Sequence, residues 1–336
     1  MSKRHWVKDH GSDLALILFI LIIALMPAVV GQYNTDTILR IMINTILVVG
    51  FRLISTCGLW SFAHVGFMSV GAYSVTLLVT KAGISFWGAL PLSLIIGGVA
   101  AYILSFPLLR TKSFVFFLAS YAIGQAILWV WILFFGGFSG LASPRPTPLP
   151  FLPSIEFNTV LPMYYLVFIF TVISLFIMYR IEKSKIGVNM KAVASNEILS
   201  QSAGINALQY KRLAFIIGST AAALAGVFWA VYTGTVQPTA FPISYSMNVL
   251  MWTIIGGLQS FAGPIIGLVL MTFLGDLLSK HLLQYLPLVY GGVFIVVILT
   301  LKGGLIRLFE MIWGKALTIV RRNHDAARPA TGKDNV

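Results

Sequence analysis

Residues 213–275 read LAFIIGSTAAALAGVFWAVYTGTVQPTAFPISYSMNVLMWTIIGGLQSFAGPIIGLVLMTFLG, a run of 63 positions without Asp, Glu, Lys or Arg. A helix needs about 20 apolar residues to cross the hydrocarbon core of a bilayer, so this run is long enough for two or three crossings. Residues 82–109, 113–144 and 157–179 are also free of charge. Because a membrane span must satisfy its own backbone hydrogen bonds, these runs predict an all-α polytopic membrane protein.

The composition points to the same class. Of 336 residues, 58% are hydrophobic and 10% are charged, whereas a soluble domain has about 25% charged residues. The net charge of +13 comes with no basic stripe among aromatic residues and no zinc-finger spacing, so we expect no nucleic-acid partner. The single cysteine, Cys57, excludes an internal disulfide. We therefore expect a multi-pass protein of the inner (plasma) membrane, in contact with lipid.

The apolar runs predict about ten transmembrane helices, some of them short or broken. We expect the spans near 14–30, 38–57, 60–80, 86–109, 113–135, 162–180, 213–232 and 286–301, with two more inside 246–280. Residues 14–30 resemble a signal peptide, but Asp9 and Asp13 in the flank favour an uncleaved first span. Gly256-Gly257 and Gly263-Pro264 predict a turn around 259–263 that divides 246–280 into two helices.

The basic residues orient this arrangement. With ten spans and both termini in the cytoplasm, 18 of the 23 basic residues lie in cytoplasmic segments, and only Lys81, Arg145 and Lys280 lie outside. Arg40 and Arg52 fall within the second span, where a central arginine costs roughly 2.5–3.5 kcal/mol. We expect both to snorkel to the headgroups; a partner inside the bundle is the alternative.

Two segments are candidates for function. In the polar loop 181–211, residues 190–203 have helical composition, Gly204 is placed to end that helix, and Asn206 can cap the next one. This loop either docks on a cytoplasmic partner or is a solvated connection. In GLWSFAHVGFMSVGAY, residues 58–73, Gly66 and Gly71 allow close packing of helices, and His64 is either packed or part of a pathway.

The sequence contains no motif for covalent chemistry. It has no nucleotide-binding loop and no HExxH spacing, and no paired carboxylates lie within an apolar span. We therefore predict that the chain is not an enzyme and has no catalytic, metal-binding or cofactor-binding residues. Residues 1–310 are expected to form a transmembrane domain, and 311–336 a cytoplasmic tail that is amphipathic and then disordered.

Four blocks resemble the LivM-type permeases of branched-chain amino acid ABC importers, together over roughly residues 50–305. SFAHVGFMSVGAY at 61–73 is similar to the family's Ser-Leu-Gly-His-x-x-Phe-x-x-x-Gly-Ala-Tyr block, and ASNEILSQSAGINALQYKRLAF at 194–215 to its coupling loop. AALAGVFWAVYTG at 222–234 and IIGGLQSFAGPIIG at 254–267 match its two C-terminal glycine-rich blocks. The run TKSFVFFLASYAIGQ after Arg110 is less similar.

The resemblance implies a fold like that of a type II ABC importer and a set of partners. These are a second, LivH-like permease, two cytoplasmic ATPases that bind the ATP, and a solute-binding protein on the outer side. Coupling to the ATPases is implied for residues of the loop: Ala194, Asn196, Glu197, Ala203 and Gly204. A translocation path or helix breaks are implied for His64, Gly66, Gly71, Gly256, Gly257, Gly263 and Pro264.

A secondary carrier or channel that works without ATPase subunits is the alternative function. Such a protein is expected to have ion-binding or ion-pairing residues in mid-span, and we find none in the sequence. The resemblance implies leucine, isoleucine and valine as substrates, and aromatic amino acids, other amino acids, amides or urea remain open.

Overall fold

The computed structural model describes residues 26–27, 32–111, 113–135, 140–143, 145–146, 159–279, 285–300 and 304–305. Apart from Met26 and Pro27, the expected first span at 14–30 lies outside these residues, as does the tail at 311–336. The expected count of ten spans therefore stays a prediction.

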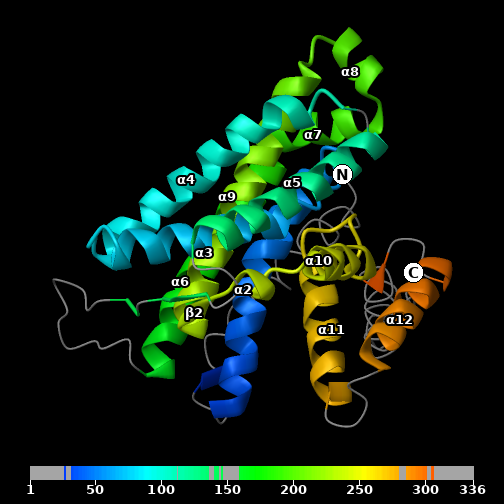
Figure 1. Cartoon of the computed structure of the whole chain (residues 1–336). Coiled ribbons are helices and arrows are strands. Elements are labelled where there is room, and N and C mark those ends of the chain that lie inside the picture. The colour runs from blue at the N-terminus through cyan, green and yellow to red at the C-terminus, as the bar shows by residue number, and fades with distance from the viewer. Residues whose placement is uncertain are drawn as a thin grey trace, which may run out of the picture.

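The described part of the chain is almost entirely helical (Figure 1). Its helices are α2 (Gln32–Ser55), α3 (His64–Thr80), α4 (Phe86–Leu108), α5 (Ser113–Phe134), α6 (Val160–Lys183), α7 (Lys185–Ser195), α8 (Glu197–Ser202), α9 (Ala207–Thr233), α10 (Ile243–Gly256), α11 (Gly263–Ser279) and α12 (Leu286–Thr300). Five helices within the described residues are long and apolar enough to cross a membrane, namely α2, α4, α5, α6 and α9.

Helix α9 is the centre of the bundle and packs on α2, α3 and α4 (Figure 1). Its small residues allow this. A Cβ atom on Gly226 would overlap the carbonyl oxygen of Met68 in α3, and one on Gly71 would overlap that of Ala223 in α9. The backbones of α3 and α9 are thus in direct contact, the arrangement that small residues permit between membrane helices.

Exposure separates the inner helices from the outer ones. Most of α2 and α9 is buried, whereas α5 is mostly exposed and presents apolar side chains such as Phe114 and Leu133. A continuous apolar surface of this kind is suited to lipid.

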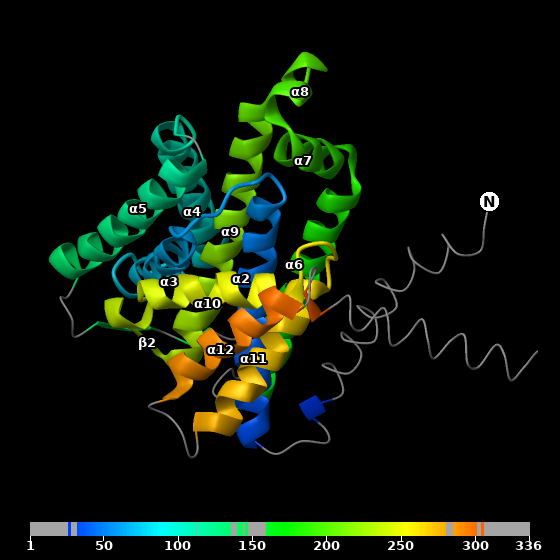
Figure 2. The same ribbon diagram turned by 90° about the vertical axis from the view of Figure 1, so that its right-hand side faces the viewer.

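The run 246–280 is divided as the glycines predict. Helix α10 ends at Gly256, Gly257 has a φ of +104°, and α11 begins at Gly263. In both ribbon views α10 lies across the direction of α2, whereas α11 runs along it (Figures 1 and 2). A Cβ on Gly256 would overlap the carbonyl of Gly263, so the two helices meet with their backbones in contact.

The two ends of the bundle differ. Helices α7 and α8 project from one end (Figure 2). Towards the other, the short strands β1 (Leu141–Ala142) and β2 (Thr235–Val236) pair antiparallel, followed by the 3₁₀ turn η2 (Pro238–Ala240). Because β2 follows α9 directly, this ribbon and the α7–α8 projection lie at opposite ends of α9.

Candidate functional site

The projecting segment consists of two helices, not the single helix 190–203 that composition predicts. The chain breaks at Asn196, whose backbone is extended with a φ of −157° and whose side-chain oxygen accepts a hydrogen bond of 3.0 Å from the N–H of Leu199. Asparagine is more favourable at an N-cap than in a helix interior. Helical composition over 190–203 does not show that this preference interrupts the helix. The expected cap of α9 is present, since Asn206 accepts from the N–H of Gln209 at 3.2 Å.

The residues that the coupling loop predicts lie on this projection. Ala194 lies beside Gly58, in the turn after α2, and Ala203 is the C-cap of α8. Glu197, the first residue of α8, accepts a hydrogen bond from Lys211 of α9 at 2.7 Å. Gly204 has a φ of +82°, which agrees with the predicted helix end, and no atom lies within 4 Å of a Cβ placed on it.

The tip of α8 exposes apolar side chains. Ile198 is 78% exposed and Leu199 is 67% exposed, and α8 itself projects beyond the long apolar helices (Figure 1). Apolar side chains that point away from their own domain, next to charged ones, are typical of a surface that contacts another protein.

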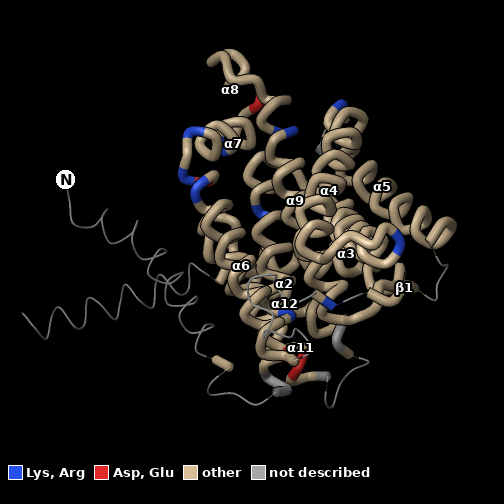
Figure 3. Tube along the Cα trace, turned by 90° about the vertical axis from the view of Figure 1, so that its left-hand side faces the viewer, with Lys and Arg blue, Asp and Glu red and all other residues tan. Residues whose placement is uncertain are grey.

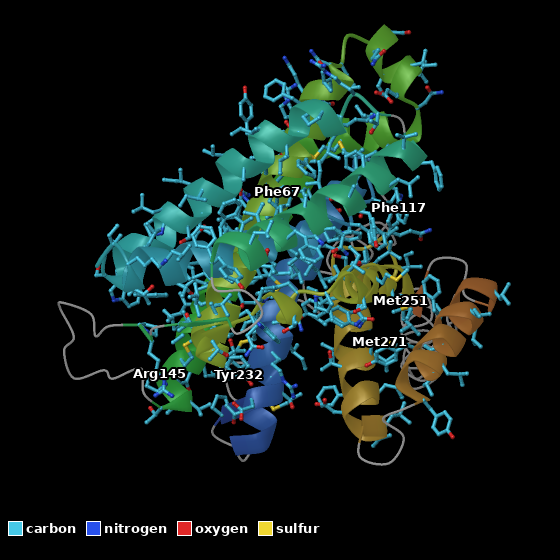
Figure 4. The ribbon with its side chains drawn as sticks, viewed as in Figure 1. Phe67, Phe117, Arg145, Tyr232, Met251 and Met271 are labelled. Carbon is cyan, nitrogen blue, oxygen red and sulfur yellow. The ribbon has the colours of Figure 1, made fainter. Side chains whose placement is uncertain are left out.

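Basic residues gather at the same end (Figure 3). Arg212 lies over the ring of Phe106 at 4.4 Å, which places the C-terminal half of α4 beside the start of α9. At the opposite end, Arg145 follows β1 (Figure 4). The described basic residues near α7 and α8 are Arg110, Arg180, Lys183, Lys185, Lys191, Lys211 and Arg212.

Arg52 does not snorkel, so that expectation is wrong. Its side chain is 1% exposed, and it donates from Nε and Nη2 to the two carboxylate oxygens of Glu182 at 3.1 and 2.6 Å. Its Nη1 donates to the carbonyl of Leu258 at 2.5 Å. A side chain on α2 thus holds both the end of α6 and the α10–α11 turn, because a buried arginine must have its charge and N–H groups satisfied.

Glu182 also connects this buried pair to the surface. Lys191 of α7 donates to its Oε1 at 2.9 Å, and Lys191 is 52% exposed. Glu182 is not among the site residues that the sequence predicts. The one signal for it is that an arginine inside a span requires an anionic partner, and acidic residues are few in this chain.

Arg40, towards the other end of α2, is 39% exposed. Its Nη2 lies 3.9 Å from a carboxylate oxygen of Asp276 in α11 and donates to Thr37 at 3.3 Å. The hydroxyl of Thr37 in turn donates to Asp276 at 3.1 Å. Arg40 therefore has polar contacts in the bundle while remaining partly accessible.

Three residues of the predicted path pack against other helices. His64 is fully buried, and its Nε2 lies 2.8 Å from the carbonyl oxygen of Leu47. A Cβ on Gly66 would lie 3.2 Å from the Cα of Gly124 in α5, and Gly71 contacts α9 as described. Packing accounts for these contacts, as the sequence allowed, and a role in translocation stays a prediction.

The remaining predicted path residues form the α10–α11 turn. Gly263 contacts the carbonyl of Gly257, and Pro264 follows it in the first turn of α11, where proline lacks only an N–H that would be unpaired anyway. Beside this turn is an open pocket of about 310 Å³, lined by Ser55, Thr56, Lys191, Leu258 and Gln259. Among the described residues, no group of three or more His, Cys, Asp or Glu side chains is placed to hold a metal ion.

Comparison with known proteins gives a consistent result. The family described as branched-chain amino acid transport system / permease component matches residues 34–301. The high-affinity branched-chain amino acid transport system permease protein LivM of Salmonella typhimurium (strain LT2) is 26% identical over an alignment 322 residues long, and the alignment covers 87% of this chain and 74% of that protein. The protein of the same name from Escherichia coli (strain K12) has the same identity and coverage. No solved structure matches the chain. The family match spans most of the sequence, and the chain therefore belongs to this permease family, as a multi-pass inner-membrane permease subunit of an ABC importer.

Proposed function

We propose that α7 and α8 form the coupling element of the importer and dock on a cytoplasmic ATPase through Ile198 and Leu199. The single observation behind this proposal is the exposure of these two side chains at the tip of α8. Their burial in a cleft of a partner would remove two large apolar surfaces from water, worth about 1.5–3 kcal/mol each. Glu197 and Gly204, at the two ends of α8, hold that tip in shape.

The orientation is part of the same proposal. The end with α7 and α8 faces the cytoplasm, both termini lie there, and the chain crosses the membrane about ten times. The cluster of basic residues around α7 supports this, because cytoplasmic loops carry an excess of Lys and Arg.

The family match supports ABC transporter partners in general, and we propose the following subunits. A second, LivH-like permease completes the membrane part, and two ATPases bind the ATP, so that this chain needs no cofactor and no catalytic activity of its own. A solute-binding protein docks on the opposite end, where β1 and β2 pair. The names of the two relatives support branched-chain or related amino acids as the substrate.

The translocation path in this proposal runs beside the α10–α11 turn. Gly256, Gly257, Gly263 and Pro264 interrupt the helix there, and an interrupted helix offers backbone polar groups to a solute inside the membrane. His64, Gly66 and Gly71 shape the wall that α3 contributes. Movement of α7 and α8 on ATP binding would change which side of the membrane the path opens to.

The test is Ile198→Glu in the complete importer reconstituted in vesicles. We expect stimulation of ATP hydrolysis by the solute-loaded binding protein to fall at least tenfold, because a carboxylate replaces an apolar contact. Leu208→Glu on α9 is the control and should keep the stimulation, since Leu208 is also exposed, at 44%, but lies outside α7 and α8.

Two results would contradict the proposal. One is normal stimulation in Ile198→Glu together with normal transport. The other is solute uptake by vesicles that contain this permease without any ATPase, which would favour the secondary carrier.

A further inference from the structure

We propose that Arg52 is the positioning residue through which movement of the coupling helix α7 reaches the α10–α11 turn. This inference rests on the proposed function, because it assumes that α7 and α8 move when the ATPase acts. It adds the route by which that movement enters the membrane part of the protein.

The hydrogen bonds form a continuous sequence from the surface to the turn. Lys191 on α7 donates to Oε1 of Glu182, and the same oxygen accepts from Nη2 of Arg52. Arg52 then donates from Nη1 to the carbonyl oxygen of Leu258. Three side chains therefore connect four segments of the bundle: α7, α6, α2 and the turn.

The carbonyl of Leu258 is available because the helix ends before it. Gly257 has a φ of +104°, so the chain leaves the helical path and Leu258 lies in the turn before α11 begins. A backbone acceptor outside a helix needs another donor when it is buried near a membrane. Arg52 supplies that donor, and its guanidinium also lies 5.9 Å from the ring centre of Phe261 in the same turn.

Helix α11 is also connected to α2 at its far end. There Thr37 donates to Asp276, and Arg40 lies 3.9 Å from it. Arg40 and Arg52 are separated by about 18 Å along α2, and Gly263 and Asp276 are separated by about 20 Å along α11. The two helices are thus antiparallel neighbours with polar contacts at both ends, and a change at Arg52 alters how one end of α11 is held.

The pocket beside the turn leaves room for movement. Its lining includes Ser55 and Thr56 at the end of α2, Lys191 of α7, and Leu258 and Gln259 of the turn. When α7 shifts, Lys191 separates from Glu182, and the carboxylate turns more fully towards Arg52. The Nη1 group can then leave the Leu258 carbonyl, and the turn can move into the pocket. Because α10 and α11 are packed backbone to backbone, the turn moves together with the ends of both helices. Directional hydrogen bonds such as those of Arg52 permit a two-state exchange of this kind.

The first experiment uses Arg52→Lys in the reconstituted importer, in a Cys57→Ala background. Lysine keeps the charge but cannot make the bidentate contact and reach Leu258 at once. We expect the number of solute molecules transported per ATP hydrolysed to fall at least tenfold.

The second readout is the labelling rate of Gln259→Cys in the same importer. This rate should change between the nucleotide-free and vanadate-trapped states, and with Arg52→Lys that change should disappear. Arg40→Lys, the same substitution at a half-exposed site of the same helix, should leave both readouts as in the parent.

The outcomes separate this inference from the proposed function. If the parent importer shows no solute-stimulated ATP hydrolysis, the proposed function fails. If stimulation is normal and Arg52→Lys has the parent's transport per ATP and the parent's labelling change, only the role of Arg52 fails. A proportional loss of hydrolysis and transport, with the labelling change retained, would make Arg52 purely structural and overturn the inference as well.

A second variant decides the matter if Arg52→Lys does not insert. In Ser55→Cys/Gln259→Cys, a reducible bifunctional thiol reagent connects the turn to α2 across the pocket while Arg52 stays intact. We expect cross-linking to lower the transport rate at least tenfold and reduction of the cross-link to restore it. Full transport by the cross-linked protein would mean that the turn does not move, and would overturn the inference.

Discussion

The contact between α3 and α9 and the contacts around Arg52 hold the bundle together in different ways. In the first, Gly71 and Gly226 bring two backbones together with no room for a methyl group. In the second, a few charged side chains span the distances between segments. Packing of the first kind has one arrangement, whereas hydrogen-bonded ions can change partners. Helices α10 and α11 also pack backbone to backbone, so we infer that the part around α9 is rigid and that the contact between α2 and the α10–α11 turn is the adjustable one.

The largest expected effect comes from Arg52→Met. This change leaves the Glu182 carboxylate buried with only Lys191 as a charged partner, so we expect a loss of about 3 kcal/mol in the free energy of unfolding. Unfolding in mixed detergent and dodecyl sulfate, followed by circular dichroism, measures it. The double variant Arg52→Met/Glu182→Met removes both charges and should recover most of the stability. An equal loss in the double variant would contradict the ion-pair explanation.

Gly226→Ala should lower the free energy of unfolding by about 2 kcal/mol, because the added methyl group would overlap the Met68 carbonyl and force α3 and α9 apart. Gly291→Ala on α12 is the matched control, since a Cβ there has no neighbour within 4 Å, and alanine in an open helix position stabilises by about 0.5–1 kcal/mol. The same unfolding assay applies to both. If the two variants have equal stability, the α3–α9 contact is not as close as the structure has it.

Gly204→Ala should destabilise the end of α8 by a smaller amount, about 1 kcal/mol, because only the φ of +82° opposes a side chain there. Gly204→Asn should lose less, since asparagine tolerates this backbone conformation better. Hydrogen exchange at the amides of α8 reports this local change. If both variants leave the exchange rates unchanged, the left-handed backbone conformation at residue 204 is not what ends α8.

The smallest effect concerns Cys57, in the turn after α2. Burial raises the pKa of its thiol to about 12, and the thiolate is the reactive form. Below that pKa almost no thiolate is present, so maleimide labelling of the folded protein should stay slow from pH 7 to 9. The unfolded protein should react at least tenfold faster at pH 8. Fast labelling of the folded protein would show that Cys57 is accessible.

Much of this arrangement follows from local sequence patterns. The division of 246–280 was predictable because Gly256-Gly257 and Gly263-Pro264 end or begin a helix through their own backbone conformation. The cap at Asn206 was predictable for the same local reason. The break at Asn196 was missed because composition gave no reason to prefer capping over a continuous helix. The partner of Arg52 lies 130 residues away along the chain, and a pattern along one helix contains no information about such a contact.

The central claim is that the α7–α8 projection is presented to the cytoplasm, where an ATPase can bind it. The most direct measurement is labelling of Ile198→Cys, in a Cys57→Ala background, with a membrane-impermeant maleimide. With the permease expressed without its ATPases, inside-out vesicles should be labelled rapidly, because Ile198 is 78% exposed in this chain, and sealed right-side-out vesicles should not be labelled until they are opened. Rapid labelling in the sealed right-side-out vesicles would place α8 on the outer face and contradict the account.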